Sequence, residues 1–348
     1  MDKKMIGVAL LASLTGIGVT SAASLIVAYN KIFTRQERPD YSLTPGEYFY
    51  PRIEPRLPRR EFTFPSQKNK LQGYYYSAKG DKGVVIISHG IHAGADDYLP
   101  LIESIVRHGY DVFAYDSTGT YSSEGKSTVG MCQQLIDLES AIEFIRSEDN
   151  LRAKQIFLVG HSWGAYAAAS VLNIRGDVAG CAAVSGMISG PEMILEKAKD
   201  YVGGLAKVPA PALEVYQRLL FKDYVDLDAV GGINSTNAPI LVCHGVDDKV
   251  IRFDGQAIIA HKDKLTNPSA SYHIGKGLRG GHDSIWHSNE AIAYQMEIES
   301  ELKLMRMKKG AELNCAERAA FFSGINHKLY SAPSEELTES IVKTFERY

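Results

Sequence analysis

A nucleophilic serine is indicated by the sequence GHSWG at residues 160–164, which has G-x-S-x-G spacing. The apolar run 156–159 before it predicts a strand, and the alanine-rich run 165–173 after it predicts a helix. A sharp turn between strand and helix holds a serine hydroxyl exposed, and the helix N-terminus supplies positive potential for an oxyanion. The spacing also arises by chance in surface loops, but these flanking elements favour Ser162 as a nucleophile.

A serine nucleophile needs a base, and the base needs an orienting carboxylate. The predicted strand 271–274 is followed by a glycine-rich loop that ends at His282, which makes His282 the candidate base. The predicted strand 240–244 is followed by Asp247 and Asp248, and the residues alone do not separate these two carboxylates. All three side chains follow the carboxyl ends of predicted strands, the edge at which α/β sheets hold their sites.

Two backbone amides are candidate oxyanion donors. One belongs to Trp163, at the start of the helix behind the serine, and the other to Ile91, in the turn after the predicted strand 84–88. His89 and His244 lie in His-Gly turns, where a structural role is expected.

Short apolar runs alternate with helical patterns from residue 83 onward, which predicts βαβ units and a parallel sheet covered on both faces. A hairpin is expected first, and two helices close the chain. The predicted strands are 61–64, 72–77, 84–88, 112–115, 156–159, 181–184, 240–244 and 271–274, and the predicted helices are 98–107, 129–146, 165–173, 287–308 and 334–347.

One stretch, residues 186–238, interrupts this alternation with two amphipathic helical patterns, at 191–205 and 211–227. Helices inserted after a strand end are placed to cover a substrate as a cap, although they also serve simply to pad a sheet.

The amino-terminal segment 1–30 is unlike the rest, because residues 5–28 carry no charge and are long enough to cross a bilayer as a helix. We expect a retained single-span membrane anchor, with a cleaved signal peptide or a buried core helix as alternatives. Basic residues flank both sides, so the side of the cell membrane that carries the rest is open, and cleavage would give a secreted protein. Five prolines indicate that residues 31–59 are a linker, which leaves 60–348 as the catalytic domain.

Composition excludes several classes of protein. The chain has 348 residues, of which 45% are hydrophobic and 23% charged, and such values exclude disorder and coiled coils. A net charge of −3 argues against general nucleic-acid binding. The sequence shows no CxxC pair, phosphate-binding loop or cluster with metal-ligand spacing, so we expect neither a cofactor nor a metal. The oligomeric state stays open.

Five segments resemble the α/β-hydrolase superfamily in their order along the chain. The closest similarity is to the branch of lysophospholipases, monoglyceride lipases and serine aminopeptidases, over residues 60–290. The segments are 86–90, 116–125, 160–164, 244–250 and 281–282.

The resemblance implies an α/β-hydrolase fold, with a mostly parallel sheet, an inserted helical cap and no cofactor. It implies that Ser162 is the nucleophile, that His282 is the base, and that the Ile91 and Trp163 amides form the oxyanion hole. In this branch the acid is the fourth residue after the histidine of an HGxxD motif, which here is Asp248. Two departures stand out: the segment 116–123 lacks the usual arginine, and the chain continues well beyond the histidine.

The function that follows is hydrolysis of a small or lipid-like ester through an acyl-enzyme on Ser162, with Ser162, Asp248 and His282 as a triad. A serine aminopeptidase is the first alternative, with Glu192, Glu196 and Asp200 available to hold a free amine. The second alternative is a membrane-tethered binding protein without catalysis.

Overall fold

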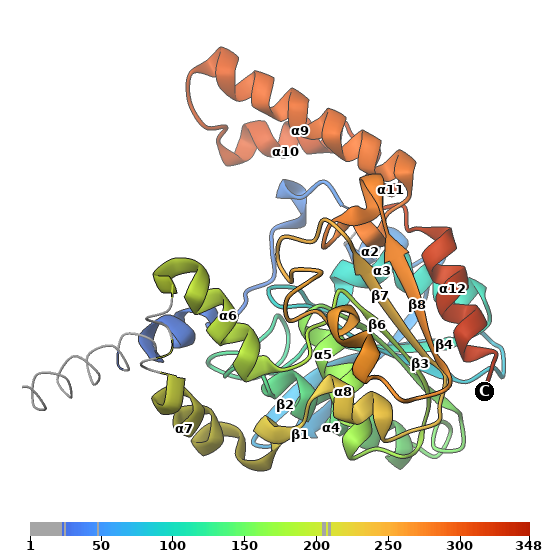
Figure 1. Ribbon diagram of the computed structural model, residues 1–348. Coiled ribbons are helices and arrows are strands. Elements are labelled where there is room, and N and C mark those ends of the chain that lie inside the picture. The colour runs from blue at the N-terminus through green and yellow to red at the C-terminus, as the bar shows by residue number, and fades with distance from the viewer. Residues whose placement is uncertain (1–22, 24–25, 47–48, 204–206, 208–209) are drawn as a thin grey trace, which may run out of the picture.

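The fold is built on an eight-stranded sheet, seen in a computed structural model that describes residues 23, 26–46, 49–203, 207 and 210–348 (Figure 1). The order of strands is β1-β2-β4-β3-β5-β6-β7-β8. β2 pairs antiparallel with β1 and β4, whereas the later pairs are parallel, as predicted. The strands are β1 (Arg59–Ser66), β2 (Asn69–Tyr76), β3 (Val84–Ser88), β4 (Asp111–Tyr115), β5 (Ile156–His161), β6 (Val178–Val184), β7 (Ile240–Gly245) and β8 (Ala270–Gly275).

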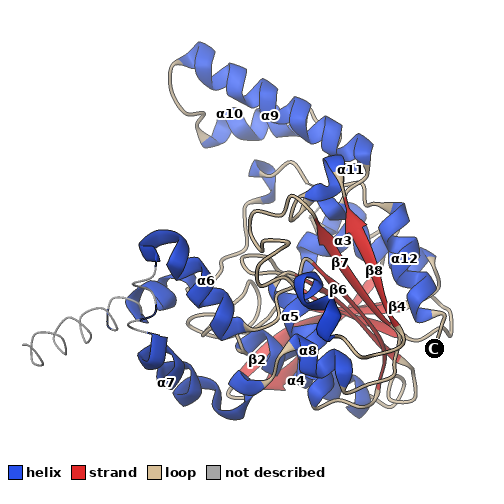
Figure 2. Ribbon diagram, in the orientation of Figure 1, coloured by secondary structure: helices blue, strands red, loops and turns tan. Residues whose placement is uncertain are grey.

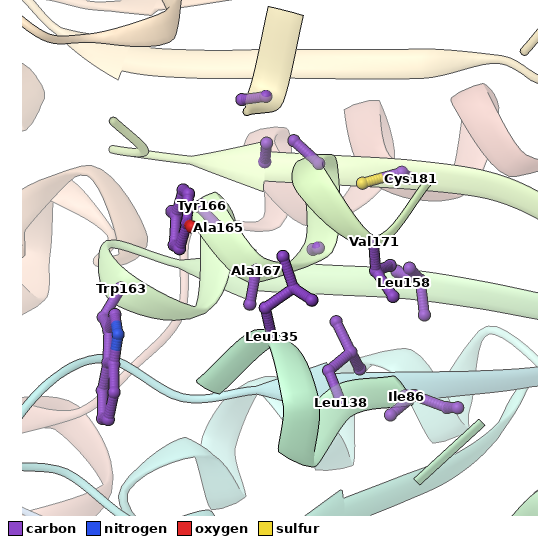
Figure 3. Packing of buried hydrophobic residues seen from close by; sticks show 14 of the residues in the cluster. Ile86, Leu135, Leu138, Leu158, Trp163, Ala165, Tyr166, Ala167, Val171 and Cys181 are labelled. Atoms are coloured by element: carbon purple, nitrogen blue, oxygen red, sulfur yellow. The ribbon is translucent and has the colours of Figure 1, made fainter. Parts of the chain in front are cut away.

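Helices cover both faces of this sheet (Figure 2). Alternate side chains of β3 enter two separate clusters, because successive residues of a strand point to opposite faces. Val84 and Ile86 pack with α4 and α5, whereas Val85 and Ile87 pack with α3 and α12. The bounds are α3 (Leu99–Arg107), α4 (Gln133–Ser147), α5 (Trp163–Ser170) and α12 (Glu335–Phe345). Figure 3 shows part of the first cluster, where α4 and α5 meet β5.

The two motif glycines are required by close backbone approaches. A Cβ on Gly164 would lie 1.9 Å from the carbonyl oxygen of Ser88, and one on Gly160 would lie 2.2 Å from that of Gly164. Since β3 and β5 pair with Ser88 opposite Gly160, the turns after these strands lie side by side at one edge of the sheet.

The insertion between β6 and β7 forms α6 (Gly190–Val202) and α7 (Ala210–Phe221), which lie together at one side of the molecule (Figure 1). The 3₁₀ segment Lys222–Asp226 and α8 (Ala229–Asn234) then lead back to the sheet. The helix predicted at 191–205 ends early, because the chain turns at Gly203 with a φ of +59°.

The segment after β8 is larger than the sequence predicts. The predicted helix 287–308 corresponds to α9 (Asn289–Lys309), but α10 (Cys315–Ser323) and α11 (His327–Tyr330) follow before α12. In Figure 1, α9 and α10 project beyond the rest of the chain. Shorter 3₁₀ segments occur at Ala95–Tyr98, Val171–Asn173, Ile258–Lys264, Gly277–Gly280 and Ser284–Trp286.

The amino-terminal prediction falls largely outside the described residues, which omit 1–22 and 24–25. In the described part of the chain, no helix is both long and apolar enough to cross a membrane. The proline-rich stretch 31–59 includes two short helices, η1 (Tyr41–Leu43) and α2 (Tyr50–Ile53). Pro51 lies in the first turn of α2, where its missing N–H costs no hydrogen bond.

Candidate active site

Ser162 lies in the sharp turn between β5 and α5. Its φ of +54° and ψ of −112° are sparsely populated for a residue with a side chain, and such strain gathers at functional sites. The Ser162 amide donates to the carbonyl oxygen of Val184 at 2.9 Å, and the Ser162 carbonyl accepts from Ala165 and Tyr166 at 3.1 Å. The turn is therefore held by β6 on one side and by the helix on the other.

Asp248 and His282 are in direct contact, with 2.7 Å between Asp248 Oδ2 and His282 Nδ1. The other carboxylate oxygen, Oδ1, accepts from the amides of Val250 and Ile251 at 2.8 Å each. Asp247, the neighbour that the residues alone did not exclude, is exposed, and it is Asp248 whose carboxylate contacts the imidazole. The structure thus brings Asp248 to His282.

A second imidazole also contacts the carboxylate. His244 is fully buried, and its Nε2 lies 3.1 Å from Asp248 Oδ2 and 2.9 Å from the Ile251 carbonyl. Burial alone would raise the pKa of Asp248, but hydrogen bonds from His244 and His282 outweigh it and hold that pKa well below its usual value. Asp248 therefore stays ionised. The sequence signal for His244 is its position four residues before the aspartate.

Ser162, His282 and Ile91 line one cavity of about 360 Å³. Its wall is mostly apolar or aromatic and includes Leu101 and Trp286. The strand-end positions thus meet in space, as expected for the carboxyl edge of a parallel sheet.

The carboxyl-terminal segment forms part of the cavity wall. Ser331 and Pro333, which precede α12, line it together with His287. None of the described residues between 186 and 238 is among its lining residues. The extra residues after His282 therefore form part of the site.

The two candidate oxyanion amides lie in turns after adjacent strands. Trp163 is the first residue of α5, so its amide has no acceptor within the helix. Its indole is buried and donates to the Met131 carbonyl at 2.6 Å, which leaves the backbone as the part that can serve the site. The turn of Ile91 is held by Tyr98, whose hydroxyl accepts from the Gly90 amide at 2.9 Å.

His161, which precedes the serine, is a site residue that the sequence did not single out. Its Nδ1 lies 2.8 Å from the Tyr98 hydroxyl and its Nε2 lies 3.7 Å from Asp283 Oδ1. Burial, reinforced by the nearby His282, lowers the pKa of His161 to about 3, so the ring is neutral. His161, His282 and Asp283 each offer a ligand atom, and these atoms lie within 4.8 Å of one another. Within the described part of the chain, these three residues could hold a metal.

His89 has the structural role expected from its turn. Its Nδ1 lies 2.8 Å from the Gly90 carbonyl, and its Nε2 accepts from the Ser117 amide at 3.1 Å. Burial lowers the pKa of His89 to about 4, in keeping with a neutral ring that accepts a hydrogen bond. It ties the turn after β3 to the turn after β4.

Known proteins share this fold over much of the chain. Residues 79–230 match the family described as serine aminopeptidase, S33. A curated relative, the uncharacterized protein YfhR of Escherichia coli (strain K12), is 25% identical over 203 residues, which are 56% of this chain and 63% of that protein. The match thus spans less than two thirds of the relative's length.

Two solved esterases are similar in structure. The Pyrococcus furiosus esterase Pf2001 has a TM-score of 0.54 at 19% identity, over 79% of this chain and 98% of that one. Est1E from Butyrivibrio proteoclasticus, solved with ferulic acid bound, has a TM-score of 0.51 at 16% identity, over 71% and 99%. Sequence identities this low support a shared fold and nothing more. Together with the parallel sheet and the family match, they show that the chain has the α/β-hydrolase fold.

Proposed function

We propose that the chain is a serine hydrolase that cleaves a small carboxylic ester through an acyl-enzyme on Ser162. The observation that carries this proposal is the 2.7 Å contact between His282 and Asp248 beside a strained serine in one cavity. A buried carboxylate that fixes one imidazole nitrogen leaves the other, Nε2, as the base.

In the proposed mechanism, Ser162 Oγ attacks the carbonyl carbon while His282 Nε2 takes the hydroxyl proton. The Ile91 and Trp163 amides stabilise the tetrahedral oxyanion. The intermediate collapses, and His282 returns the proton to the departing alcohol. Water then attacks the acyl-enzyme with His282 again as base, which releases the acid and restores Ser162.

The size of the cavity favours a short or compact acyl group. A volume of about 360 Å³ is near the lower end for ligand sites. We therefore propose small esters ahead of the lipid-like esters that the family resemblance also allows, with neither nucleic acid nor cofactor involved.

Aminopeptidase activity, the first alternative, would need an acidic group free to hold an amine. Glu196 and Asp200 both pair with Arg252, at 3.5 and 3.0 Å, and lie outside the cavity lining. Within the lining, Asp97 already accepts from the Gly94 amide and the Tyr121 hydroxyl. The other acidic residue of the lining, Asp283, has a side chain that is 78% exposed, so solvent screens its attraction for an amine. These features favour the ester over the peptide.

A panel of substrates tests the proposal. The full chain is assayed with p-nitrophenyl esters of increasing chain length, a monoacylglycerol and an aminoacyl anilide, each beside Ser162→Ala. We expect the highest kcat/KM for short esters and no turnover by the variant. A preference for the anilide would favour the peptidase, and turnover unchanged in Ser162→Ala would overturn the proposal.

We also propose that residues 1–30 attach the enzyme to the cell membrane as a single span, with 31–59 as the connection and 60–348 as the hydrolase domain with its helical insertion. The uncharged run 5–28 supports this proposal. Fractionation of the full chain and of a form that lacks residues 1–22, which keeps the buried Tyr29, tests it: the full chain should sediment with membranes and resist salt extraction, and the shortened form should not. A full chain found in the soluble fraction would contradict the anchor.

A further inference from the structure

Two imidazoles beside Ser162 are held in the manner of metal ligands. A histidine that binds a metal through one ring nitrogen almost always has the other fixed by an oxygen. Here Nδ1 of His282 contacts Asp248 at 2.7 Å, and Nδ1 of His161 contacts the Tyr98 hydroxyl at 2.8 Å. Both rings therefore leave Nε2 as the nitrogen available to a ligand, and their centroids are only 5.1 Å apart.

A carboxylate completes the group. Asp283 Oδ1 lies 3.7 Å from His161 Nε2, and all three ligand atoms fall within 4.8 Å of one another. Two ligands of one tetrahedral zinc ion lie roughly 3.3 Å apart, since each bond is about 2.0–2.1 Å long. The side chain of Asp283 is 78% exposed, so it can make the remaining adjustment without disturbing the core.

The electrostatics of the cavity suit a cation. The described residues that line it include Asp97 and Asp283 but neither lysine nor arginine. Besides its 3.7 Å approach to Asp283 Oδ1, the Nε2 of His161 lies 3.4 Å from the His282 carbonyl, a weak interaction that a metal would replace.

We propose that His161, His282 and Asp283 form a site for a divalent transition metal such as Zn²⁺, and that its occupation reversibly inhibits the hydrolase. Two imidazoles, one carboxylate and a water satisfy the four-coordinate preference of zinc. The metal takes the Nε2 lone pair of His282, the same pair that accepts the proton of Ser162. Hydrolysis and metal binding therefore exclude each other.

The test is a titration with Zn²⁺, read by calorimetry and by the rate of short-ester hydrolysis. We expect one Zn²⁺ per chain, with inhibition that EDTA reverses. Loss of even an outer partner costs about 10–100-fold in metal affinity. Asp283→Asn should therefore weaken both binding and inhibition by at least about tenfold, and His161→Gln should do the same.

The matched control is Asp254→Asn, which removes one exposed carboxylate outside the cavity and should change the zinc affinity less than twofold. Equal zinc affinity in Asp283→Asn and the unmodified chain would overturn the proposal, as would activation by zinc. The inhibition measurement depends on the proposed hydrolase activity, whereas the zinc binding measured by calorimetry does not. If the chain binds zinc but hydrolyses no ester, the proposed function is wrong and the metal site stands. If it hydrolyses esters but binds no zinc, the metal site is wrong and the proposed function stands.

Discussion

The hydrogen bonds around Asp248 explain why its carboxylate is a fixed part of the site. Both oxygens are fully used, one by the Val250 and Ile251 amides and the other by His244 and His282. A carboxylate held in this way cannot rotate, so the imidazole of His282 has one preferred orientation. His244 is a positioning residue, since it touches the acid and does not line the cavity.

Tyr98→Phe is predicted to lower kcat about tenfold with little change in KM, less than the roughly 100-fold loss that follows removal of an oxyanion donor. The Tyr98 hydroxyl joins the Gly90 amide to His161, so its loss frees the turn that carries the Ile91 amide. Steady-state kinetics on a short ester measures both constants. Tyr110→Phe, which removes the hydroxyl of a tyrosine packed on Phe157 and Phe345, is the control. An unchanged kcat in Tyr98→Phe would contradict the role of this turn.

Local spacing was enough to name Ser162 and His282 as candidates, because each follows a recognisable strand and turn, and the two side chains line one cavity. The choice between Asp247 and Asp248 needed the family resemblance, since adjacent residues share every local signal. The contacts that connect Tyr98, His161 and Asp283 could not be predicted from the sequence. Their contacts join the segment after β3, the last residue of β5 and the segment after β8, which the sheet brings to one edge.

Among the elements, the amino-terminal stretch supplies the arginine side chains that the loop after β4 lacks. The segment 116–123 has no arginine, but Arg35 donates to the carbonyl oxygens of Tyr121, Ser123 and Gly125 at 2.7–3.0 Å. Arg38 adds bonds to Ser122 and a 3.5 Å contact with Asp116. Residues expected to form only a linker thus brace a loop of the hydrolase domain.

Arg35→Ala is predicted to reduce the free energy of unfolding by about 2 kcal/mol, because three bonds from one charged group are lost at a half-buried position. Urea denaturation followed by circular dichroism measures it. Glu37→Ala removes only the exposed partner of Arg35 and should change stability by less than about 0.5 kcal/mol. Equal stability of the two variants would show that this bracing is unimportant.

The carboxyl-terminal segment is predicted to limit the acyl chain. Trp286 stands edge-on to Tyr98 and His161 in the cavity wall, at 6.5 and 5.5 Å between ring centroids. Trp286→Ala should raise kcat/KM for longer acyl chains relative to acetate by about tenfold, since a methylene gained in a pocket is worth about 1–3 kcal/mol. The ester panel measures the ratio, and Trp286→Phe should keep the native preference. If Trp286→Ala keeps the native preference for acyl chain length, the acyl group does not bind against Trp286.

The sheet was predictable because its strands are buried on both faces and therefore apolar throughout, as in β3 and β6. Boundaries were less predictable: the helix expected from residue 129 begins only at Gln133, because Val129 has a φ of +61°. α10 and α11 were missed because they are short and bury little: Phe322 is the one buried residue of α10 and α11 has none, so they carry little apolar periodicity.

For the whole molecule, the exposure of the four cysteine thiols reflects how the chain is packed. Cys132, Cys181 and Cys243 are buried and Cys315 is exposed at the start of α10. Burial raises the pKa of Cys132 to about 11 and that of Cys181 to about 12. Thiolates, which are the reactive form, are therefore suppressed inside the domain.

We predict that a thiol-reactive chromophore at pH 8 modifies one cysteine per native chain and four in denaturant. Cys315→Ser should leave none reactive in the native state. Rapid modification of two or more native thiols would contradict the packing around β6, β7 and α4.

Ser162 should be an activated nucleophile, and its labelling with a fluorophosphonate probe measures this property. Mass spectrometry of the labelled full chain should place a single adduct on Ser162. Ser162→Ala should take up no label, and Asp248→Asn should react much more slowly because the imidazole loses its orienting carboxylate. An unlabelled chain, or an adduct on another residue with Ser162 unmodified, would contradict the account.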